Sequence, residues 1–519
     1  MENVETVISK AKPVASFEQN ILLTAKGGSV MFVGKLFNQF SRLVITLLLT
    51  RLLGPAQYGL YNIALSAAAI ASHFALVGLG TALVRYVALY AGRRDEQAVW
   101  GSIQIAVGIS TALSALISAL LFALSHVIAT EVFHDATLAP VLQLISFTIP
   151  LLSFSDVLAG ATRGFKRIEH MVIAQNIAQP LVRMLLLLAF SLVGLNIMQA
   201  VVIFGVADFV ASLLLIYFLN SQFPLRRPLH AARRAPREML SYSIPMWLAD
   251  TIATFRGNIQ TILLGSLSSV FTVGVFAVAN QLNQFADLVH HSVTTAVQPI
   301  IVQVHDSDNR EQLGRLYQTV SKWMFSFNVP IFLIVVMFPT PILSIFGKDF
   351  TQGATALTLL SWASLVNAGT GMCGLILDMT GYTKLKLANS VSQLALIVIL
   401  STLLIPTLGM VGAAVAALAG QSVINVLRVV EIYIIFRLLP YNASFLKPIL
   451  AGVSALLVTL IAGNWLPVSD GNLQALALIP LLACAYVGAI LLFGLEPEDR
   501  AILARVRKRA TRKLSQNRA

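Results

Sequence analysis

The sequence predicts an all-α integral membrane protein with about 14 transmembrane helices, built as two parallel six-helix repeats and two additional C-terminal helices. Three observations support this fold class. Of the 519 residues, 57% are hydrophobic and only 11% are charged, whereas a soluble domain carries about 25% charged residues. The apolar residues form long continuous runs. Short motifs in the first half of the chain return in the second half at a nearly constant spacing.

Each membrane-spanning helix needs about 20 mostly apolar residues. Continuous apolar runs indicate helices, because the strands of a membrane barrel would alternate apolar and polar residues. The fourteen predicted spans are 29–50, 57–79, 98–122, 138–159, 172–194, 197–219, 240–265, 271–303, 319–345, 354–378, 387–407, 410–436, 447–463 and 473–493.

The distribution of basic residues predicts the orientation of these spans. With the N-terminus inside, 27 of the 36 lysines and arginines fall in inner segments, including "RRPLHAARRAPR" (226–237) and "RVRKRATRK" (505–513). This asymmetry follows the positive-inside rule and predicts that both termini are cytoplasmic in the cytoplasmic (inner) membrane. It also explains the net charge of +13 without a nucleic-acid partner, since basic tails contact anionic lipid.

The same considerations predict six segments along the chain. They are a cytoplasmic N-terminal segment (1–28), a first six-helix half (29–219), a basic cytoplasmic linker (220–239), a second six-helix half (240–437), two additional helices (438–494) and a basic cytoplasmic tail (495–519).

The first turn of the chain, "RLLGPAQYGLYNIA" (51–64), has a looser copy in "SLSSVFTVGVFAVA" (266–279). Gly54-Pro55 is predicted to end the first span, because proline cannot continue a helix and restricts the residue before it. Tyr58 and Tyr61 are expected at the outer membrane interface. Gly59 is expected to let a neighbouring helix approach closely. The motif therefore shapes a helical hairpin.

Further matches at nearly the same spacing indicate an internal duplication. Gly194 and Gly205 correspond to Gly409 and Gly420 at a spacing of 215, and Asn176 corresponds to Asn389 at 213. Because six spans are an even number, both halves begin inside and the repeats are parallel. Transporters built from such repeats place the substrate between the halves and alternate its access to the two sides.

The "RLLGPAQYGLYNIA" motif after a polar-striped first span resembles the start of bacterial polysaccharide-export flippases of the MATE-like superfamily. The plan of six, six and two spans resembles this family along nearly the whole chain. The resemblance implies translocation of a polyprenyl-diphosphate-linked oligosaccharide from the inner to the outer leaflet. It also implies membrane lipids and other polysaccharide-assembly proteins as partners.

Polar residues of the first span predict a substrate site. In "KLFNQFSR", Lys35, Asn38, Gln39 and Arg42 share one helical face, which is typical of a cavity lining. Arg256 follows Arg42 at nearly the repeat spacing and lies at similar depth in the seventh span. Two guanidinium groups facing each other would suit a diphosphate. Alternatively, Lys35 reaches the inner interface, and Arg256 pairs with Asp250 or Asp287 and holds the halves together.

Other intramembrane charges have two interpretations. Asp250 and Asp287 are candidates for coupling to H⁺ or Na⁺, or are counter-ions for arginine. Arg183 and Asp208 are predicted to form a structural ion pair. Arg428 and Glu431, three residues apart near the inner end of the twelfth span, are predicted to form another.

No motif predicts catalysis, a cofactor or a metal. The sequence has no GxxxxGKS, HExxH, GxSxG or CxxC pattern, so we expect no enzyme, no cofactor and no metal site. An ion-coupled small-molecule or drug antiporter of the same superfamily is the alternative function. A membrane glycan polymerase or ligase is less favoured, because the predicted outer loops are short and carry few charges.

Overall fold

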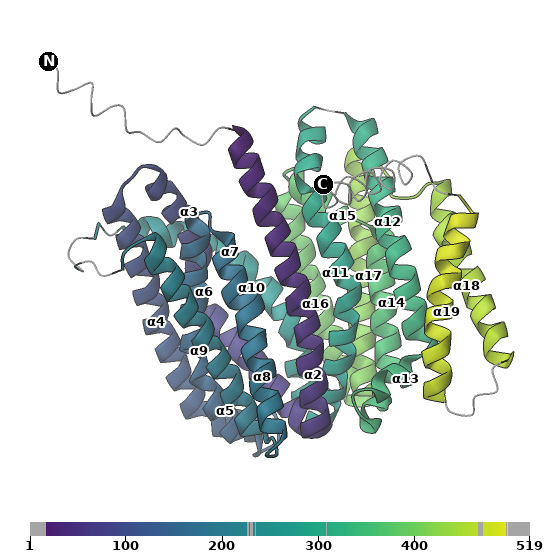
Figure 1. The fold of residues 1–519 in the computed structure, drawn as a ribbon, viewed down its shortest axis with the longest axis horizontal. Helices are drawn as coiled ribbons and strands as arrows, with labels where there is room; N and C mark the ends of the chain where they lie inside the picture. Colours follow the sequence, from purple (N-terminus) through teal and green to yellow (C-terminus); the bar gives the residue numbers. More distant parts are fainter. Residues whose placement is uncertain are drawn as a thin grey trace, which may run out of the picture.

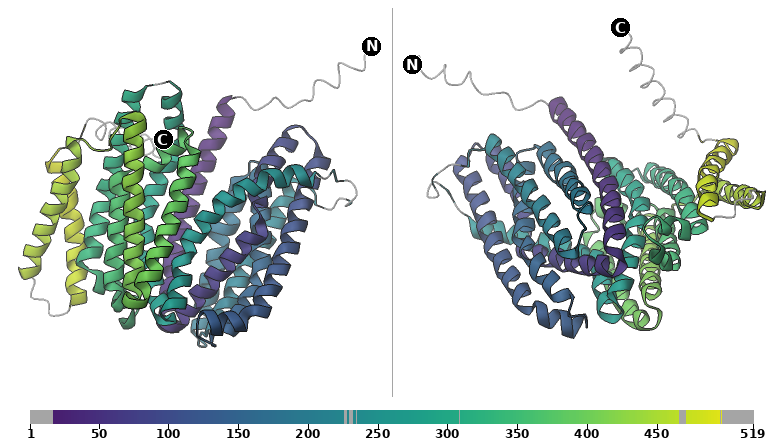
Figure 2. Two further views of the ribbon diagram at one scale, coloured as in Figure 1. Left: turned by 180° about the vertical axis from the view of Figure 1, so that it is seen from behind. Right: turned by 60° about the horizontal axis from the view of Figure 1, so that its bottom comes forward.

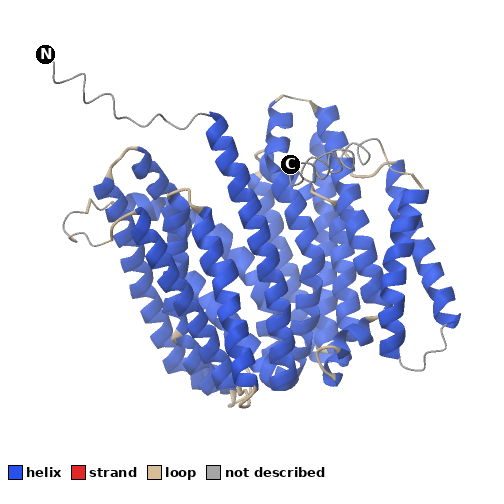
Figure 3. Cartoon of the chain, in the orientation of Figure 1, coloured by secondary structure: helices blue, strands red, loops and turns tan. Residues whose placement is uncertain are grey.

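A computed structural model gives the fold of the chain, and it describes residues 17–225, 228, 232–233, 235–307, 309–465, 471–494 and 496. Every regular element in these residues is a helix (Figure 3). The predicted N-terminal segment lies mostly outside the described residues, as do most of the basic stretch 226–237 and nearly all of the tail.

The first half contains the elements up to residue 222. They are α2 (Phe17–Leu76), α3 (Leu79–Gly92), α4 (Glu96–Val127), η1 (Ile128–Val132), α5 (Leu138–Ser146), α6 (Thr148–Gly164), α7 (Ile168–Met171), η2 (Val172–Ala178), α8 (Gln179–Ser191) and α9 (Ile197–Gln222). The short elements η1 and η2 are π-helical segments. Together these elements form one side of the molecule in Figure 1.

Most of the second half forms the other side, with α10 lying beside the first-half helices and the last two helices at the far edge (Figure 1). Its elements are α10 (Pro236–Leu267), α11 (Val270–Asp306), α12 (Arg310–Met337), α13 (Pro339–Ser344), η4 (Lys348–Gly353), α14 (Ala354–Thr370), α15 (Cys373–Met379), α16 (Thr383–Leu408), α17 (Met410–Phe436), η5 (Ala443–Phe445), α18 (Leu446–Trp465) and α19 (Gly471–Leu492). The reverse view in Figure 2 shows the same order across the molecule.

The chain is a multi-pass membrane protein. Among the described residues, nine helices are long and apolar enough to cross a membrane, and ten if the bent pair 348–370 and 373–379 counts as one span. The predicted number of about fourteen is not reached by this count. One reason is that α2 counts once, although two predicted spans fall within it.

The turn motif of the first half ends one helix and begins the next, as the sequence predicts. Gly54 has the non-helical angles φ 69° and ψ 175°, so the range Phe17–Leu76 labelled α2 contains two helices that meet at a kink beside Pro55. The second half breaks at the corresponding place, because Ser269 caps the start of α11 in a capping box with Thr272. The chain therefore turns at equivalent places in both halves, through a glycine in the first half and before a serine-capped helix in the second.

Just beyond these turns, α2 and α11 approach each other closely and reciprocally. A Cβ atom on Gly59 would lie 1.7 Å from the carbonyl oxygen of Val270, and one on Gly274 would lie 1.9 Å from that of Pro55. Val270 follows Pro55 at the same spacing that separates the two glycines. Reciprocal contacts of this kind arise where a two-fold axis relates two units, so they support the predicted duplication. The close approach expected at Gly59 is confirmed.

Tyr58 and Tyr61 do not lie at the membrane interface as predicted. Both side chains are 5% exposed, and their rings stack with centroids 6.4 Å apart. The bend at Gly54 turns them into the protein, because the residues after it continue as a helix packed against α11.

Contacts at the kink of α2 and near its C-terminal end join the two halves. At the kink, the Arg51 guanidinium donates to the carbonyl oxygens of Ile345 (2.7 Å) and Ser344 (3.3 Å) at the end of α13. Near the C-terminal end, Trp247 of α10 donates from Nε1 to the His73 carbonyl oxygen (3.1 Å). Helix α10 therefore packs against the first half as well as against α11 and α16.

Candidate functional site

A polar cavity of about 550 Å³ lies between the two halves. Its first-half lining comes from α2, α6, α8 and α9, and its second-half lining comes from α10 and α11. We call it the central cavity. The first half contributes Arg42, Ile45, Thr46, Leu49, Tyr58, Tyr61, Asn62, Leu65, Ser66, Ala69, Ser72, His73, Leu76, Leu152, Asp156, Arg183 and Phe204. The second half contributes Thr254, Gly257, Asn258, Thr261, Ala277, Asn280, Gln281 and Gln284.

Many lining residues are related by the repeat. Six pairs at the repeat spacing contribute both members to the lining, and the reciprocal glycine contact has the same spacing. The central cavity therefore lies where corresponding positions of the two halves meet. The pairs are Arg42 with Gly257, Thr46 with Thr261, Asn62 with Ala277, Leu65 with Asn280, Ser66 with Gln281, and Ala69 with Gln284.

Arg42 reaches across the cavity between the halves. Its Nη2 donates to Oε1 of Gln281 at 3.2 Å. Gln281 is 7% exposed, and its own Nε2 is buried without a partner among the described residues. The acceptor role of Oε1 is fixed, because an arginine has only donors. Arg42 is therefore held from the second half by a single neutral acceptor.

Arg256 does not face Arg42, so the two arginines predicted to share a site are separated. Arg256 lines a second cavity of about 390 Å³ within the second half, and its Nη1 donates to Oε1 of Gln393 at 2.9 Å. The register explains the difference, since the counterpart of Arg42 at the repeat spacing is Gly257. One residue along a helix turns the side chain by about 100°, which moves Arg256 away from the central cavity.

Arg42 is the member of the predicted polar stripe that lines the central cavity. Lys35 is exposed and does not line the cavity. Its exposure is compatible with the alternative interpretation, in which its side chain reaches the inner membrane interface. Asn38 donates to the Gln175 carbonyl oxygen at 3.4 Å, and Gln39 buries its Nε2 without a partner among the described residues. Along α2, the predicted stripe therefore passes from residues that contact the first half to Arg42, which lines the central cavity.

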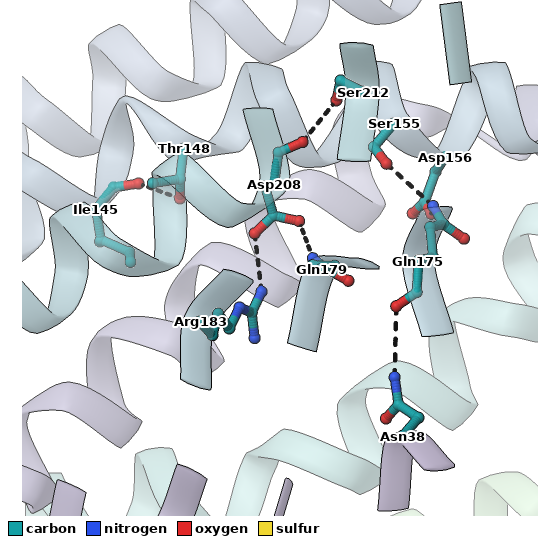
Figure 4. Close-up of polar contacts among 10 residues, drawn as sticks. All are labelled: Asn38, Ile145, Thr148, Ser155, Asp156, Gln175, Gln179, Arg183, Asp208 and Ser212. Atoms are coloured by element: carbon teal, nitrogen blue, oxygen red, sulfur yellow. Dashed lines mark hydrogen bonds and ion pairs between the residues drawn. The ribbon is translucent and has the colours of Figure 1, made fainter. Parts of the chain in front are cut away.

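The pair Arg183 and Asp208 is brought together as the sequence predicts. Arg183 Nη2 lies 2.9 Å from Oδ2 of Asp208, whose side chain is 2% exposed. Gln179 donates to the other carboxylate oxygen. The Arg183 guanidinium also lies 4.1 Å from the ring centre of Phe204. Figure 4 shows this buried carboxylate between its two donors.

The π-helical segment η2 forms a second polar network beside the first (Figure 4). Gln175 in η2 donates from Nε2 to Ser155 Oγ (3.0 Å) and to Asp156 Oδ1 (3.5 Å), and its carbonyl oxygen accepts from Asn38. Asp156 belongs to the cavity lining. This network therefore connects α2, α6 and η2 next to the central cavity.

The predicted pair Arg428 and Glu431 is wrong. Glu431 accepts instead from Asn389 Nδ2 at 2.7 Å, and Arg428 lines the second cavity with Arg256, Asp250 and the ion pair of Lys386 and Asp378. Residues three apart on a helix meet only if both side chains turn toward each other. Here Glu431 turns toward Asn389, and Arg428 turns toward the second cavity.

The structure describes the side chain of only one of the two candidates for ion coupling. Asp250 lines the second cavity together with Arg256, away from the central cavity. The side chain of Asp287 lies outside the described residues, although its backbone lies in α11. Within the described part of the chain, no group of three or more His, Cys, Asp or Glu side chains could hold a metal ion.

Sequence reasoning missed the amide side chains of the second-half wall. Asn280, Gln281 and Gln284 share one face of α11, and Asn258 of α10 lines the same cavity. A signal was present, because several amides so close together in an apolar span need polar surroundings. Asp156 was also missed, although an aspartate in an apolar span gives the same signal.

Two helical halves with a cavity between them are the fold of solved MATE-like membrane transporters, and the likeness is one of fold. The lipid II flippase MurJ in an inward closed conformation superposes with a TM-score of 0.70 over 91% of this chain and 98% of that chain, at 13% identity. An inward-facing MATE multidrug resistance transporter gives a TM-score of 0.65 over 77% of this chain and 94% of that chain, at 16% identity.

The chain belongs to the polysaccharide biosynthesis protein family, whose sequence profile matches residues 24–305. The MatE profile matches residues 245–404. The "Probable flippase AglR" of Haloferax volcanii is 24% identical over 310 residues, which cover 58% of this chain and 61% of that relative. Stage V sporulation protein B of Bacillus subtilis is 21% identical over 459 residues, covering 82% of this chain and 88% of the relative.

Proposed function

We propose that the chain translocates a polyprenyl-diphosphate-linked oligosaccharide across the cytoplasmic membrane by alternating access between its two halves. The observation that carries the proposal is Arg42 in a polar cavity between the repeats. A charge inside the membrane costs at least about 2.5–3.5 kcal/mol on insertion scales, so a charged cavity wall needs a function or a partner. The family profile and the flippase named among the relatives support the same substrate class.

In this proposal Arg42 binds the diphosphate, because a guanidinium group can donate two parallel hydrogen bonds to phosphate oxygens. Lys35, Asn38 and Gln39 continue the same helix toward the predicted cytoplasmic side and guide the head group to Arg42. Arg256 takes the structural role, since its guanidinium group joins α10 to α16 through Gln393.

The proposed orientation places both termini in the cytoplasm, on the basis of the basic inner segments. The bend of α2 at Gly54 then lies on the outer side. Asp250 and Asp287 are the proposed sites of coupling to H⁺ or Na⁺. The protein does no covalent chemistry on the glycan in this scheme, and other polysaccharide-assembly proteins supply and use the lipid.

The alternative is an ion-coupled antiporter for small molecules, which the MatE profile over residues 245–404 favours. The two functions differ in the ligand of the central cavity. An exporter of cationic drugs needs an anionic or apolar wall, whereas Arg42 places in the cavity a guanidinium group whose acceptor among the described residues, Gln281, is neutral. This guanidinium group favours the lipid diphosphate.

A leaflet-translocation assay tests the proposal. Purified protein is reconstituted in vesicles with a fluorescent polyprenyl-diphosphate oligosaccharide, and the fraction that becomes accessible to an impermeant quencher is followed. We expect translocation above protein-free vesicles and above vesicles with the Arg42→Ala variant. Transport of a cationic dye together with no lipid translocation would establish the antiporter instead.

A further inference from the structure

The two walls of the central cavity differ in chemistry. Apart from the two tyrosines, the ionisable residues of the lining are Arg42, His73, Asp156 and Arg183, and all four belong to the first half. Among the side chains that the structure describes, the second half contributes no ionisable group to the lining and supplies four of its five amide side chains. We call these surfaces the charged wall and the amide wall. The amide wall consists of Asn258, Asn280, Gln281 and Gln284.

The charged wall is suited to an anion at Arg42. Arg42 and Arg183 both line this wall, and guanidinium groups bind anions. The Asp208 carboxylate offsets the charge of Arg183, whereas Arg42 has only the neutral acceptor Gln281 among the described residues. Asp156 adds a carboxyl group to the same wall, where its Oδ1 accepts from Gln175 at 3.5 Å, so the anion site is placed at Arg42 and not along the whole wall.

The amide wall is suited to hydroxyl groups. The side chains of Asn280 and Gln284 make no hydrogen bond to any residue that the structure describes, and Asn258 uses only Nδ2, which donates to the Thr254 carbonyl oxygen at 2.9 Å. Each amide offers both a donor and an acceptor. A sugar hydroxyl needs the same combination, whereas a phosphate needs donors alone.

The cavity lining leaves space for a ligand at Gly257, the counterpart of Arg42 in the second half. A Cβ atom on Gly257 would meet nothing within 4 Å. Of these two equivalent lining positions, one therefore carries an arginine and the other leaves open space. A ligand group held by Arg42 has room to extend toward the amide wall.

We propose that the substrate lies across the central cavity in one orientation, with its diphosphate on the charged wall at Arg42 and its first sugars on the amide wall. This inference rests on the proposed function and adds how each part of the substrate is recognised. It assigns glycan binding to Asn258, Asn280 and Gln284, and phosphate binding to the opposite half.

Paired ligands test this orientation. Purified protein is titrated calorimetrically with a polyprenyl diphosphate that carries no sugar and with the same lipid carrying a neutral oligosaccharide. The test variant is Asn280→Leu with Gln284→Met, which keeps side-chain size and removes hydrogen bonding. The matched control is Asn62→Leu, which removes the amide of the charged wall.

We expect the double variant to bind the glycosylated lipid about 5–100-fold more weakly, because two hydrogen bonds to neutral groups are lost. Its affinity for the sugar-free diphosphate should stay within about twofold of native. Arg42→Gln should weaken both ligands alike. The single variant Gln284→Met repeats the test if the double variant does not fold.

Two results overturn the proposal. The first is an equal loss of affinity for both lipids in the amide-wall variant. The second is native protein that binds both lipids equally, since the amide wall then contributes nothing to glycan recognition while the proposed flippase function stands. Native protein that binds neither lipid overturns the proposed function together with this inference.

Discussion

A difference of one residue in register separates the two arginines that the sequence suggested as a pair. Arg42 faces the central cavity, whereas Arg256 lies one position before the true counterpart Gly257 and faces the second cavity. On a helix this shift changes the direction of the side chain by about 100°. The two arginines are therefore expected to respond differently to substitution.

For Arg42 we expect a graded loss of transport without loss of protein. Arg42→Lys keeps the charge but loses the planar fork, and Arg42→Ala loses both. A charge-assisted hydrogen bond contributes about 1.5–3 kcal/mol, so transport should fall from native to Lys to Ala. The translocation assay measures the ranking, and immunoblotting of membranes measures abundance.

Arg183 is the matched control, because it lines the same cavity but pairs with the buried Asp208. Breaking a buried ion pair by removing one partner costs about 3–5 kcal/mol. Arg183→Ala should therefore lower abundance as well as transport. A proportional fall of both quantities in the Arg42 variants would show that Arg42 is structural too.

Arg256 is expected to act through the fold. Arg256→Ala leaves Gln393, which is buried, without the donor that reaches its Oε1, and an unsatisfied buried acceptor costs about 1–3 kcal/mol. The variant should lower the melting temperature of purified protein. Translocation per folded molecule should remain near native, and a selective loss of transport at native stability would contradict the structural role.

At the scale of residues, the sequence identifies which polar side chains lie within the spans. It predicts the directions of these side chains less well. The ion pair of Arg183 and Asp208 follows from two opposite charges in neighbouring spans. The direction of Arg256, the separate environments of Arg428 and Glu431, and the amide wall depend on helix rotation. Rotation is set by packing against several neighbours, which one sequence does not show.

At the scale of elements, the contact of α2 with α11 depends on the absence of two side chains. Gly59→Ala or Gly274→Ala would place a methyl group 1.7 Å or 1.9 Å from a carbonyl oxygen, so the helices must separate. Overpacking of this kind costs about 1–3 kcal/mol. We expect a lower melting temperature for each variant, whereas Gly108→Ala, which meets no atom within 4 Å, should leave it unchanged.

Arg51 is expected to hold the bent end of α2 to the second half through the carbonyl groups at the end of α13. In a background without Cys373 and Cys484, a cysteine at Ser66 reports access to the central cavity. Arg51→Ala should raise its labelling by an impermeant thiol reagent added to the outer side. Ser266→Ala, at the position equivalent to Arg51, is the control and should leave labelling unchanged, and equal rates in both variants would exclude a closing role for Arg51.

The turn motif shows which part of an element the sequence predicts. A glycine and a proline indicate the end of a helix, and the first helix does end at Gly54. The motif does not tell in which direction the next helix leaves the turn, because that direction depends on its packing against α11. The same uncertainty moved Tyr58 and Tyr61 from the expected interface to the interior.

At the scale of the whole molecule, the proposed orientation makes a direct prediction. Cysteines introduced at Ala232 and Ser515 should resist impermeant thiol reagents in intact cells, because the basic segments that contain them are retained in the cytoplasm. A cysteine at Ser469, in the predicted outer connection before α19, should react. Labelling at Ala232 in intact cells would reverse the orientation.

The helical fold class, the family and the repeat spacing follow from composition and motifs, because these features are spread over many residues. The central cavity was anticipated only in outline, as a site between the halves. Its location and two-sided chemistry come from the meeting of α2, α10 and α11, and such meetings depend on contacts between residues that lie far apart in the chain.

The reciprocal contact of Gly59 and Gly274 also constrains how the two halves of the chain can differ in sequence. At this closest approach each glycine meets a neighbour of its own counterpart, so a side chain added in one half disturbs the other half at once. Positions away from the closest approach have no such mutual restriction, as Arg42 and Gly257 illustrate. Two halves that meet symmetrically at their glycines can therefore line one cavity unequally, with an arginine from one half and bare backbone from the other.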